Sequence, residues 1–323
     1  MRHAIGIDIG GGSTKIGLVS ETGEILARST IAAVPGQPGE VIFDVYASAI
    51  GGLVPQGLPL SGIGIGYPGP IHPGNLSGGL GNVPGLVDYP LAQRLTDRLG
   101  LPARFENDAT AAALAEARFG ANSAARRLLM VTAGTGIGAA MIVDGQAMVT
   151  SGGCLGDAGH IIVGGGSSLR CRLGCAGCLE ALASAEALDT RAQDHATLHP
   201  KGAIARLSEE DGTPVTAATV IRCALAGDPD ARDLLAEAGR WIGRAVASWV
   251  HTFAPDTVVL GGGLMAAGAL LLSPLEAEAR RCGLPGYMAG LRFAPATLGN
   301  DAGIIGAAAQ IFTAMPHSAQ TAG

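Results

Sequence analysis

The sequence AIGIDIGGGSTKIGLV at residues 4–19 decides the fold of this chain. Its apolar segments predict two strands, Ala4–Ile9 and Thr14–Val19, and the glycines between them predict a tight turn at Gly10–Ser13. A Glu-Thr-Gly turn then leads into a third predicted strand, Ile25–Thr30. The N-terminal segment is therefore expected to form a meander whose first bend is rich in glycine.

A second unit of the same kind follows much later in the chain. Leu128–Val131 and Ile137–Val143 are predicted strands on either side of a glycine turn at Ala133–Gly136. An Asp-Gly hairpin turn at Asp144-Gly145 then precedes a short strand, Gln146–Val149. A repeated unit indicates a duplicated architecture, and we expect an α/β fold of two domains with a ligand cleft between them.

The expected domains are residues 1–122, joined by a C-terminal helix within 302–323, and residues 123–301. The chain has 323 residues, which is long enough for two hydrophobic cores. Residues 120–127 and the surroundings of residue 301 are the expected hinges. The other expected elements are the helices Gly39–Gly51, Leu91–Leu99, Ala109–Phe119, Ala217–Ala226, Ala231–Phe253 and Ala302–Met315, and the strands Ser61–Gly66, Ala103–Glu106 and Thr257–Leu260.

Composition argues against two classes of partner. The chain is mildly acidic, with 21 Lys and Arg against 27 Asp and Glu, which does not favour nucleic acid or an anionic membrane surface. No apolar run approaches the roughly 18 residues that span a bilayer. We expect a cytoplasmic protein with a small-molecule partner. Glycine is unusually abundant, at 51 residues, so the position of each glycine matters.

Glycine clusters stand at both predicted bends. The phosphates of a nucleotide need closely spaced backbone N–H groups, and a Cβ atom would hold the ligand away from them. Gly10-Gly11-Gly12-Ser13 and Gly134-Thr135-Gly136 meet this need as a pair, although each alone is also compatible with a plain hairpin turn. A third cluster, Gly261-Gly262-Gly263, follows a predicted strand and is placed to lie beneath an adenine ring.

A further glycine motif is misleading. Gly64-Ile65-Gly66-Tyr67-Pro68-Gly69 fits the dinucleotide-binding fingerprint G-x-G-x-x-G after a strand. That fingerprint must run into a helix, whereas Pro68-Gly69-Pro70 predicts a bend, so we reject a dinucleotide site here.

Cysteines gather in one stretch of the chain. Cys154, Cys171, Cys175 and Cys178 lie close together in the sequence, and in a reducing compartment such clustering favours metal ligation over disulfides. Cys223 and Cys282 are expected to be ordinary buried thiols.

Taken together and in order, the motifs of this chain resemble the ROK family of bacterial sugar kinases and repressors. The resemblance runs nearly end to end and implies the two-domain, actin-like ATPase fold with ribonuclease H-like domains. It also implies ATP-dependent phosphorylation of a hexose or amino sugar with the help of Mg²⁺, at the 6-hydroxyl as in a glucokinase. The implied assembly is a homodimer or a dimer of dimers. The motifs are Ile7-Asp8-Ile9-Gly10-Gly11, Gly66-Tyr67-Pro68-Gly69-Pro70, Asn107-Asp108-Ala109, Gly134-Thr135-Gly136-Ile137-Gly138, Gly159-His160, Gly177-Cys178-Leu179-Glu180 and Leu260-Gly261-Gly262-Gly263.

The resemblance implies a role for individual residues. Asp108 would be the general base that accepts the proton of the sugar hydroxyl. Because it precedes a predicted helix, Asp108 is also a candidate N-cap. Asp8 would act near the phosphates through Mg²⁺ and water, and Lys15 would reach them. The other implied sugar contacts are Gly69, Asn82, Asn107, Asp157, His160 and Glu180, and the other implied phosphate and nucleotide contacts are Gly10, Gly11, Gly12, Ser13, Gly134, Thr135, Gly136, Gly262 and Gly263.

The chain departs from the family pattern at two places. Gly12 and Ser13 stand where Thr and Lys usually follow the glycine pair, and a lysine at the position of Lys15 also occurs in relatives that use polyphosphate, so the donor stays open between ATP and polyphosphate. The family's Glu-x-Gly-His reads Asp157-Ala158-Gly159-His160 here. The shorter carboxylate puts glucose itself in doubt.

The implied metal ligands are His160, Cys171, Cys175 and Cys178, a set suited to structural, tetrahedral Zn²⁺. The family pattern has its middle cysteine where Leu173 stands, so Cys175 would have to replace it, and Cys154 is a spare candidate. A bound zinc would orient the imidazole of His160 toward the sugar.

Other functions compete with the kinase. One is a sugar-responsive repressor of the same family, which the start of the first strand near Met1 and the acidic charge disfavour. A second is an ATPase activator of a radical dehydratase with an iron–sulfur cluster, and a third is a chaperone-like or filament-forming actin relative. Among kinases, glucose, N-acetylglucosamine, N-acetylmannosamine, fructose, mannose and biosynthetic amino sugars stay open as acceptors.

Overall fold

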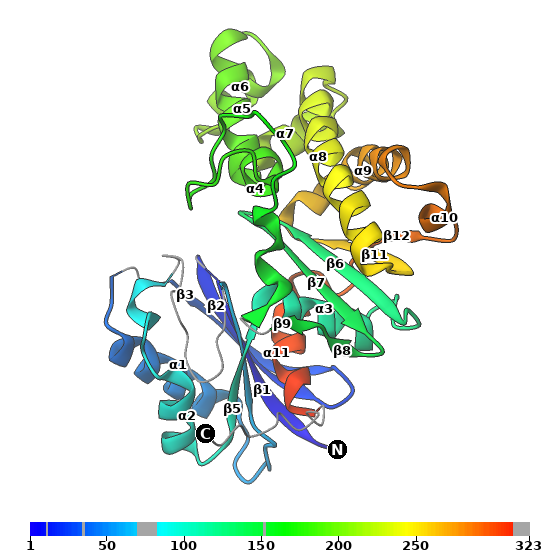
Figure 1. The fold of residues 1–323 in the computed structure, drawn as a ribbon. Helices are drawn as coiled ribbons and strands as arrows, with labels where there is room; N and C mark the ends of the chain where they lie inside the picture. Colours follow the sequence, from blue (N-terminus) through cyan, green and yellow to red (C-terminus); the bar gives the residue numbers. More distant parts are fainter. Residues whose placement is uncertain (11, 34–35, 70–82, 151–152, 313–323) are drawn as a thin grey trace. The chain divides into compact units, whose positions relative to one another are not determined.

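The computed structural model describes residues 1–10, 12–33, 36–69, 83–150 and 153–312. The chain forms two compact units (Figure 1). Unit 1 comprises Met1–Ser123, Val149–Cys154 and Asn300–Gly323, and unit 2 comprises Ala124–Met148 and Leu155–Gly299. Each unit has its own sheet and its own hydrophobic core.

The sheet of unit 1 has the strand order β3-β2-β1-β4-β5. The predicted meander is confirmed, because β1 (His3–Ile9) pairs antiparallel with β2 (Ser13–Ser20), and β2 pairs antiparallel with β3 (Ile25–Ala32). On the other side of β1, β4 (Ile63–Tyr67) and then β5 (Ala103–Asn107) continue the sheet in parallel. Parallel pairing needs crossover connections, which helices supply here.

Helices α1 (Gly39–Leu53) and α2 (Leu91–Leu99) contribute to the larger core of unit 1. Their apolar residues, such as Phe43 and Leu95, are buried together with the isoleucines of β1 and β4. Helix α2 has the predicted bounds and ends at Gly100, which has a positive φ of 67° and therefore suits a residue without a Cβ atom.

Helix α11 (Ala302–Phe312) packs on the strands at very close range. A Cβ atom on Gly6 of β1 would collide with the carbonyl of Ile304, and one on Gly64 of β4 would collide with the carbonyl of Ala307. The two glycines therefore allow the backbone of α11 to lie almost against the sheet. Helix α3 (Asp108–Phe119) also packs against α11.

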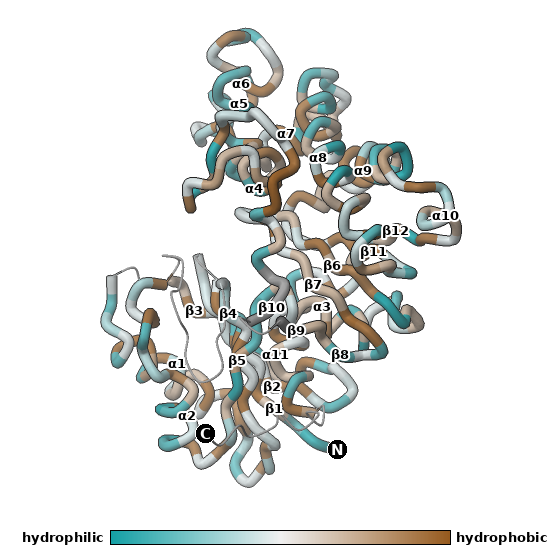
Figure 2. The backbone as a smooth tube through the Cα atoms, in the orientation of Figure 1, coloured by the Kyte–Doolittle hydropathy of each residue, from teal (hydrophilic) through white to brown (hydrophobic). Residues whose placement is uncertain are grey.

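The sheet of unit 2 has the strand order β12-β11-β6-β7-β8. The second strand-turn-strand unit is confirmed as the antiparallel pair β6 (Arg127–Ala133) and β7 (Ile137–Val143). The hairpin turn then leads to β8 (Gln146–Ala147), while β11 (Thr257–Gly261) and β12 (Arg292–Pro295) add to β6 in parallel. In Figure 2 hydrophobic residues, drawn in brown, run along β6 and β7.

The helices of unit 2 follow the cysteine-containing loop, as expected. The longest, α8 (Pro229–Phe253), begins with Asp228 as its N-cap, whose carboxylate accepts a hydrogen bond from the N–H of Ala231 at 2.8 Å. Its apolar face, with Leu235, Ile242 and Val246, lies in the core. The other helices are α4 (Leu179–Ala183), α5 (Ala185–Leu198), α6 (Ala203–Asp211), α7 (Ala217–Leu225), α9 (Ala269–Cys282) and α10 (Pro285–Met288).

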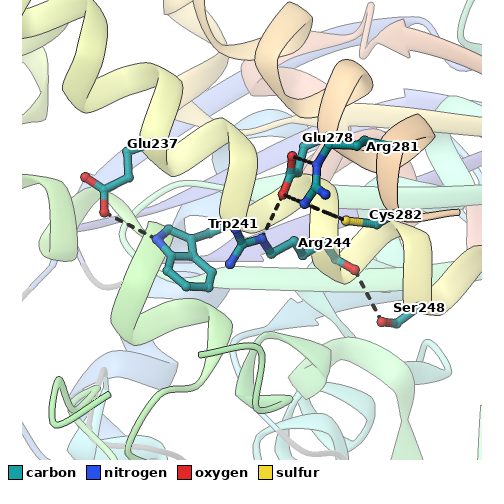
Figure 3. A network of polar contacts seen from close by, with 7 residues as sticks. All are labelled: Glu237, Trp241, Arg244, Ser248, Glu278, Arg281 and Cys282. Atoms are coloured by element: carbon teal, nitrogen blue, oxygen red, sulfur yellow. Dashed lines mark hydrogen bonds and ion pairs between the residues drawn. The ribbon is translucent and has the colours of Figure 1, made fainter. Parts of the chain in front are cut away.

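An ion-pair network joins α8 to α9 (Figure 3). The buried carboxylate of Glu278 accepts hydrogen bonds from Arg244 at 2.8 Å and from two nitrogens of Arg281 at 2.7 Å each. Hydrogen bonding to Arg281 lowers the pKa of Glu278 to about 2. The guanidinium of Arg244 also stacks 4.4 Å from the ring centre of Trp241. The neighbouring Cys282 is exposed, so the prediction that it is buried is wrong.

Among the described residues, we find no helix that is both long enough and apolar enough to cross a bilayer.

Candidate active site

The first glycine bend joins β1 to β2 in unit 1. The N–H of Gly10 donates a hydrogen bond to the carbonyl of Ser13 at 3.0 Å, and the carbonyl of Gly12 accepts one from Ala33 at 3.0 Å. A Cβ atom on Gly12 would meet no atom within 4 Å, so the space beside this glycine is open. Gly11 lies outside the described residues.

Asp8 and Lys15 flank this bend. They are direct partners in the β1–β2 register, and the ammonium of Lys15 lies 3.6 Å from the carboxylate of Asp8. Lys15 also donates a hydrogen bond to the carbonyl of Asn300 at 3.1 Å. The strand pairing thus places one anion and one cation at the mouth of the bend.

The carboxylate of Asp8 is closely surrounded. Burial raises its pKa, and the charge of Lys15 opposes that shift. Gly303, at the start of α11, lies against it, because a Cβ atom there would come within 2.5 Å of one carboxylate oxygen and 2.7 Å of the other. A partly buried carboxylate beside this glycine bend is a suitable ligand for a hard cation such as Mg²⁺.

The second glycine bend belongs to unit 2 and meets the third glycine cluster. The N–H of Gly134 donates a hydrogen bond to the carbonyl of Gly136 at 2.9 Å, which closes the bend. A Cβ atom on Gly134 would lie 3.8 Å from the nitrogen of Gly263. Gly262 has a φ of 90° and lies against the backbone of Ala133, so only glycine fits there without strain. The two clusters, distant in sequence, are therefore neighbours in space.

Asn107 and Asp108 stand at the junction of β5 and α3. The N-cap of α3 is Asn107, not Asp108, because the side-chain oxygen of Asn107 accepts a hydrogen bond from the N–H of Thr110 at 3.1 Å. The amide nitrogen of Asn107 donates to the carbonyl of Gly69 at 3.2 Å. Asp108 is the first residue of the helix and is half-buried. Asn82 lies outside the described residues.

Glu106 is a further acidic group at this junction that the sequence reasoning missed. Its carboxylate accepts a hydrogen bond from the N–H of Asn107 at 2.9 Å. Burial raises the pKa of Glu106 to about 7. Arg104 and Asn107 are polar neighbours in the same strand, so the sequence carries no signal that this carboxylate is buried.

Asp157, His160 and Glu180 belong to unit 2. Asp157 and His160 lie in the short 3₁₀ segment Leu155–His160, which is kinked at Asp157. Burial raises the pKa of Asp157, and His160 opposes the shift. Glu180 lies in the first turn of α4, and its carboxylate accepts a hydrogen bond from the N–H of Ile137 at 3.1 Å. The structure thus brings Glu180 to the second glycine bend.

The predicted metal ligands form a cluster. The ligand atoms of His160, Cys171 and Cys178 all lie within 4.8 Å of one another, and Nδ1 of His160 is 3.7 Å from Sγ of Cys171. Cys175 lies outside this group of three. It forms a hydrogen bond with Cys171, and this bond is the main cause of the rise in the pKa of Cys175. One imidazole nitrogen and two or three thiols are donors that fit Zn²⁺. The side chain of Cys154 is not among those described.

A cavity of about 700 Å³ also lies in unit 2, among α6, α7 and the start of α8. Arg206, Leu207 and Cys223 are among the residues that line it, and it contains none of the glycine bends. It is therefore distinct from the candidate active site.

Comparisons with known proteins cover nearly the whole chain. Residues 4–313 match the model of the ROK family. A glucokinase of Halalkalibacterium halodurans is 32% identical over 94% of this chain and 93% of its own length. The crystal structure of a ROK family glucokinase from Streptomyces griseus in complex with glucose and AMPPNP is 33% identical, with a TM-score of 0.81 over 95% of this chain and 98% of that one. The transcriptional repressor Mlc of Escherichia coli is 30% identical over 68% of this chain and 53% of its own length.

Proposed function

This chain belongs to the ROK family and is a sugar kinase; from that premise, we propose that it transfers the γ-phosphoryl group of ATP to a hydroxyl of a hexose or amino sugar. Similarity to glucokinases along nearly the full length supports this reaction, with the 6-hydroxyl of glucose as the default acceptor. The chain has the two-domain, actin-like α/β fold of its structural neighbours.

Asp108 acts as the general base. Phosphoryl transfer depends mainly on positioning and on stabilising charge, and the one acid–base step is removal of the proton from the sugar hydroxyl. The N-cap of α3 supports this assignment most directly. Asn107 performs the capping role, so capping does not explain the presence of Asp108 at this position. The hydrogen bond from Asn107 to Gly69 fixes the segment that presents Asp108.

The glycine bends bind the phosphate donor. In unit 1, a hydrogen bond from Gly10 to Ser13 closes the bend, the space beside Gly12 is open, and Lys15 supplies a positive charge. In unit 2, a hydrogen bond from Gly134 to Gly136 closes the bend of Gly134, Thr135 and Gly136, next to Gly262 and Gly263. Mg²⁺ supplies further charge to the phosphates when it is bound, and Asp8 is the residue suited to hold it. The position of Lys15 also keeps polyphosphate as an alternative donor.

Sugar recognition is assigned to a set of polar residues. Asn107, Asp157, His160 and Glu180 are the described side chains, and Asn82 is the further candidate. Because aspartate stands at position 157 in place of the family's glutamate, the carboxylate is one methylene shorter. An amino sugar or an N-acetylhexosamine therefore competes with glucose as the natural acceptor.

His160, Cys171 and Cys178 hold a structural Zn²⁺, with Cys175 as the fourth ligand. The short distances within the cluster support this site. The ion would fix the loop between Cys171 and Cys178 relative to His160, and thereby orient the imidazole. A homodimer, or a dimer of dimers, remains a prediction.

A regulator is the second candidate function, because the similarity to a repressor extends over 68% of this chain. The chain, however, matches 53% of that repressor and 93% of the glucokinase, which favours the enzyme.

Two assays over a panel of hexoses and amino sugars test the proposal: ADP release with ATP as the donor, and sugar-phosphate formation with polyphosphate as the donor. We expect ADP release that depends on one sugar and is lost in Asp108→Ala. If no sugar stimulates ADP release and Asp108→Ala leaves any basal ATPase unchanged, the kinase proposal fails. Specific retention on DNA without kinase activity would support the regulator.

A further inference from the structure

Glu180 is in direct contact with the second glycine bend. One oxygen of its carboxylate accepts a hydrogen bond from the N–H of Ile137, the first residue of β7, at 3.1 Å. The same oxygen occupies the space beside Gly136, because a Cβ atom on Gly136 would collide with it. The carboxylate therefore packs against the bend and bonds to the residue that ends it.

The segment that carries Glu180 also holds the other end of the bend. The N–H of Ala185, at the junction of α4 and α5, donates a hydrogen bond to the carbonyl of Gly134 at 2.8 Å. Glu180 and Ala185 thus bond to the two ends of the bend, and both belong to one short stretch of chain.

This stretch is itself anchored on the cysteine cluster. The sulfur of Cys178 accepts a hydrogen bond from the N–H of Ala181 at 3.4 Å and caps α4. The N–H of Leu179 donates to the carbonyl of Ile161, next to His160, at 2.9 Å. Helix α4 is short, at five residues, so anchors at its start fix the position of Glu180 within it.

We propose that Glu180 is a positioning residue for the phosphate donor: it holds the bend Gly134–Gly136 in the shape that binds the donor's phosphates, independently of any contact with the sugar. The inference rests on the proposed role of this bend in binding the donor. It adds to Glu180 a second role, because the family resemblance assigns this residue to the sugar. A carboxylate suits the task, since its hydrogen bond to a backbone N–H is charge-assisted and stronger than a neutral one.

Binding of a non-hydrolysable ATP analogue with Mg²⁺, measured by calorimetry without sugar, tests the proposal on the full chain. Glu180→Ala removes the acceptor, and we expect the dissociation constant to rise about tenfold, as for the loss of one good hydrogen bond. Glu180→Gln keeps an acceptor oxygen at the same distance from the backbone and is expected to stay within about threefold of wild type. Glu186→Ala, in the neighbouring helix α5, removes an ion pair with Arg172 of the cysteine-containing loop; it is the matched control and should bind as wild type does.

A double-mutant cycle with Gly136 sharpens the test. Gly136 does not have a positive φ, so alanine fits its backbone conformation, and the oxygen of Glu180 is the atom in its way. We expect Gly136→Ala to weaken analogue binding about tenfold in the wild type and by less than about threefold in the Glu180→Ala background. Equal losses in both backgrounds would overturn the inference.

The outcomes separate this inference from the proposed function. If the wild type binds the analogue and Glu180→Ala binds it equally well while sugar affinity falls, Glu180 serves the sugar alone and the inference fails by itself. If the wild type does not bind the analogue, the proposed kinase function fails first. Thermal unfolding of each variant identifies any loss of binding that comes from loss of folding, and normal binding by a folded Glu180→Gln supports the inference.

Discussion

Asn107 closes the start of helix α3 by accepting a hydrogen bond from the backbone N–H of Thr110 at 3.1 Å. The neighbouring Asp108 is thereby released from the capping role. Its carboxylate does accept a hydrogen bond from the N–H of Ala109 at 2.7 Å, but this contact is local to the first turn. The structure therefore gives the capping role to Asn107 and not to Asp108, in keeping with the role of general base that we propose for Asp108.

Asp108→Asn is expected to abolish most of the kinase activity without unfolding the protein. Loss of a general base lowers kcat by about 10²–10⁴-fold, whereas the asparagine occupies the same volume at a position that is not the cap. Steady-state kinetics and thermal unfolding of the same preparation measure both effects. Asn107→Ala is the contrasting variant, since loss of an N-cap costs about 1 kcal/mol of stability. Full activity in Asp108→Asn would contradict the assignment.

Much of the fold was predictable because its signals are local. The glycine bends follow apolar strands of ordinary length, and the amphipathic helix Leu91–Leu99 has the predicted bounds. Two features depend on information that the sequence does not carry. Asn107 and Asp108 are equally good caps by composition, and only the extended backbone of Asn107, at φ −61° and ψ 143°, selects it. Helix α9 contains Pro274, which ordinarily signals the end of a helix.

The candidate site was predictable as a set of motifs but not as a set of contacts. The hydrogen bond from the N–H of Ile137 to the carboxylate of Glu180 joins residues 43 positions apart in the sequence. The burial of Glu106 depends on packing around the end of β5, which its sequence neighbours Phe105 and Asn107 do not reveal. The distance of Cys175 from the three clustered ligands depends on the path of a loop, which spacing alone does not determine.

Glu106→Gln is expected to change how stability depends on pH. Burial raises the pKa of Glu106 from 4.5 to about 7, so the folded protein holds this proton more tightly than the unfolded chain does. The resulting stabilisation is complete below pH 4.5 and is lost as the pH rises through 7. The difference in free energy of unfolding between the variant and wild type should therefore shift by about 2 kcal/mol in favour of the variant as the pH rises from acid to neutral.

Urea unfolding at several pH values between about 5 and 8 measures this difference. The exposed Glu24→Gln, also in unit 1, is the matched control and should follow the wild type at every pH. A difference between Glu106→Gln and wild type that does not vary with pH would contradict the burial argument.

Glu278→Gln is expected to show the opposite dependence. Hydrogen bonding to Arg281 lowers the pKa of Glu278 from 4.5 to about 2, so its stabilisation is present above pH 4.5 and is lost as the pH falls toward 2. At neutral pH the free energy of unfolding of the variant should be about 2 kcal/mol lower than that of wild type, because a neutral amide replaces the buried carboxylate that bonds to two arginines. The deficit should shrink as the pH falls to about 3, as denaturant unfolding would reveal.

Glu276→Gln is the control for Glu278→Gln on the same helix. Glu276 pairs with Arg280, and both side chains are about 40% exposed, at 37% and 41%. An exposed pair contributes about 0–1 kcal/mol, so this variant should be nearly neutral at every pH. Equal effects of the two substitutions would show that burial does not matter at Glu278.

Zinc content provides a test that does not depend on activity. We expect one zinc per chain by elemental analysis of freshly purified protein, and loss of that zinc in Cys178→Ser together with weaker sugar binding. Cys175→Ser decides whether Cys175 is the fourth ligand, since it should lose the metal only if it is. Cys282→Ser, at an exposed thiol outside the cluster, should retain the zinc. Freshly purified wild-type protein without bound metal would exclude the site.

Gly64→Ala is expected to destabilise unit 1 through overpacking. Gly64 lies in β4, and an added methyl group would collide with the carbonyl of Ala307 and lie 3.0 Å from the side-chain nitrogen of Gln310. Helix α11 would have to move away from the sheet, which costs about 1–3 kcal/mol.

Gly51→Ala is the matched substitution in α1, where an added methyl group would meet no atom within 4 Å. Because alanine favours a helix over glycine, Gly51→Ala should stabilise the protein by up to about 1 kcal/mol. Thermal unfolding midpoints that shift in opposite directions would support the close packing of α11, and equal shifts would contradict it.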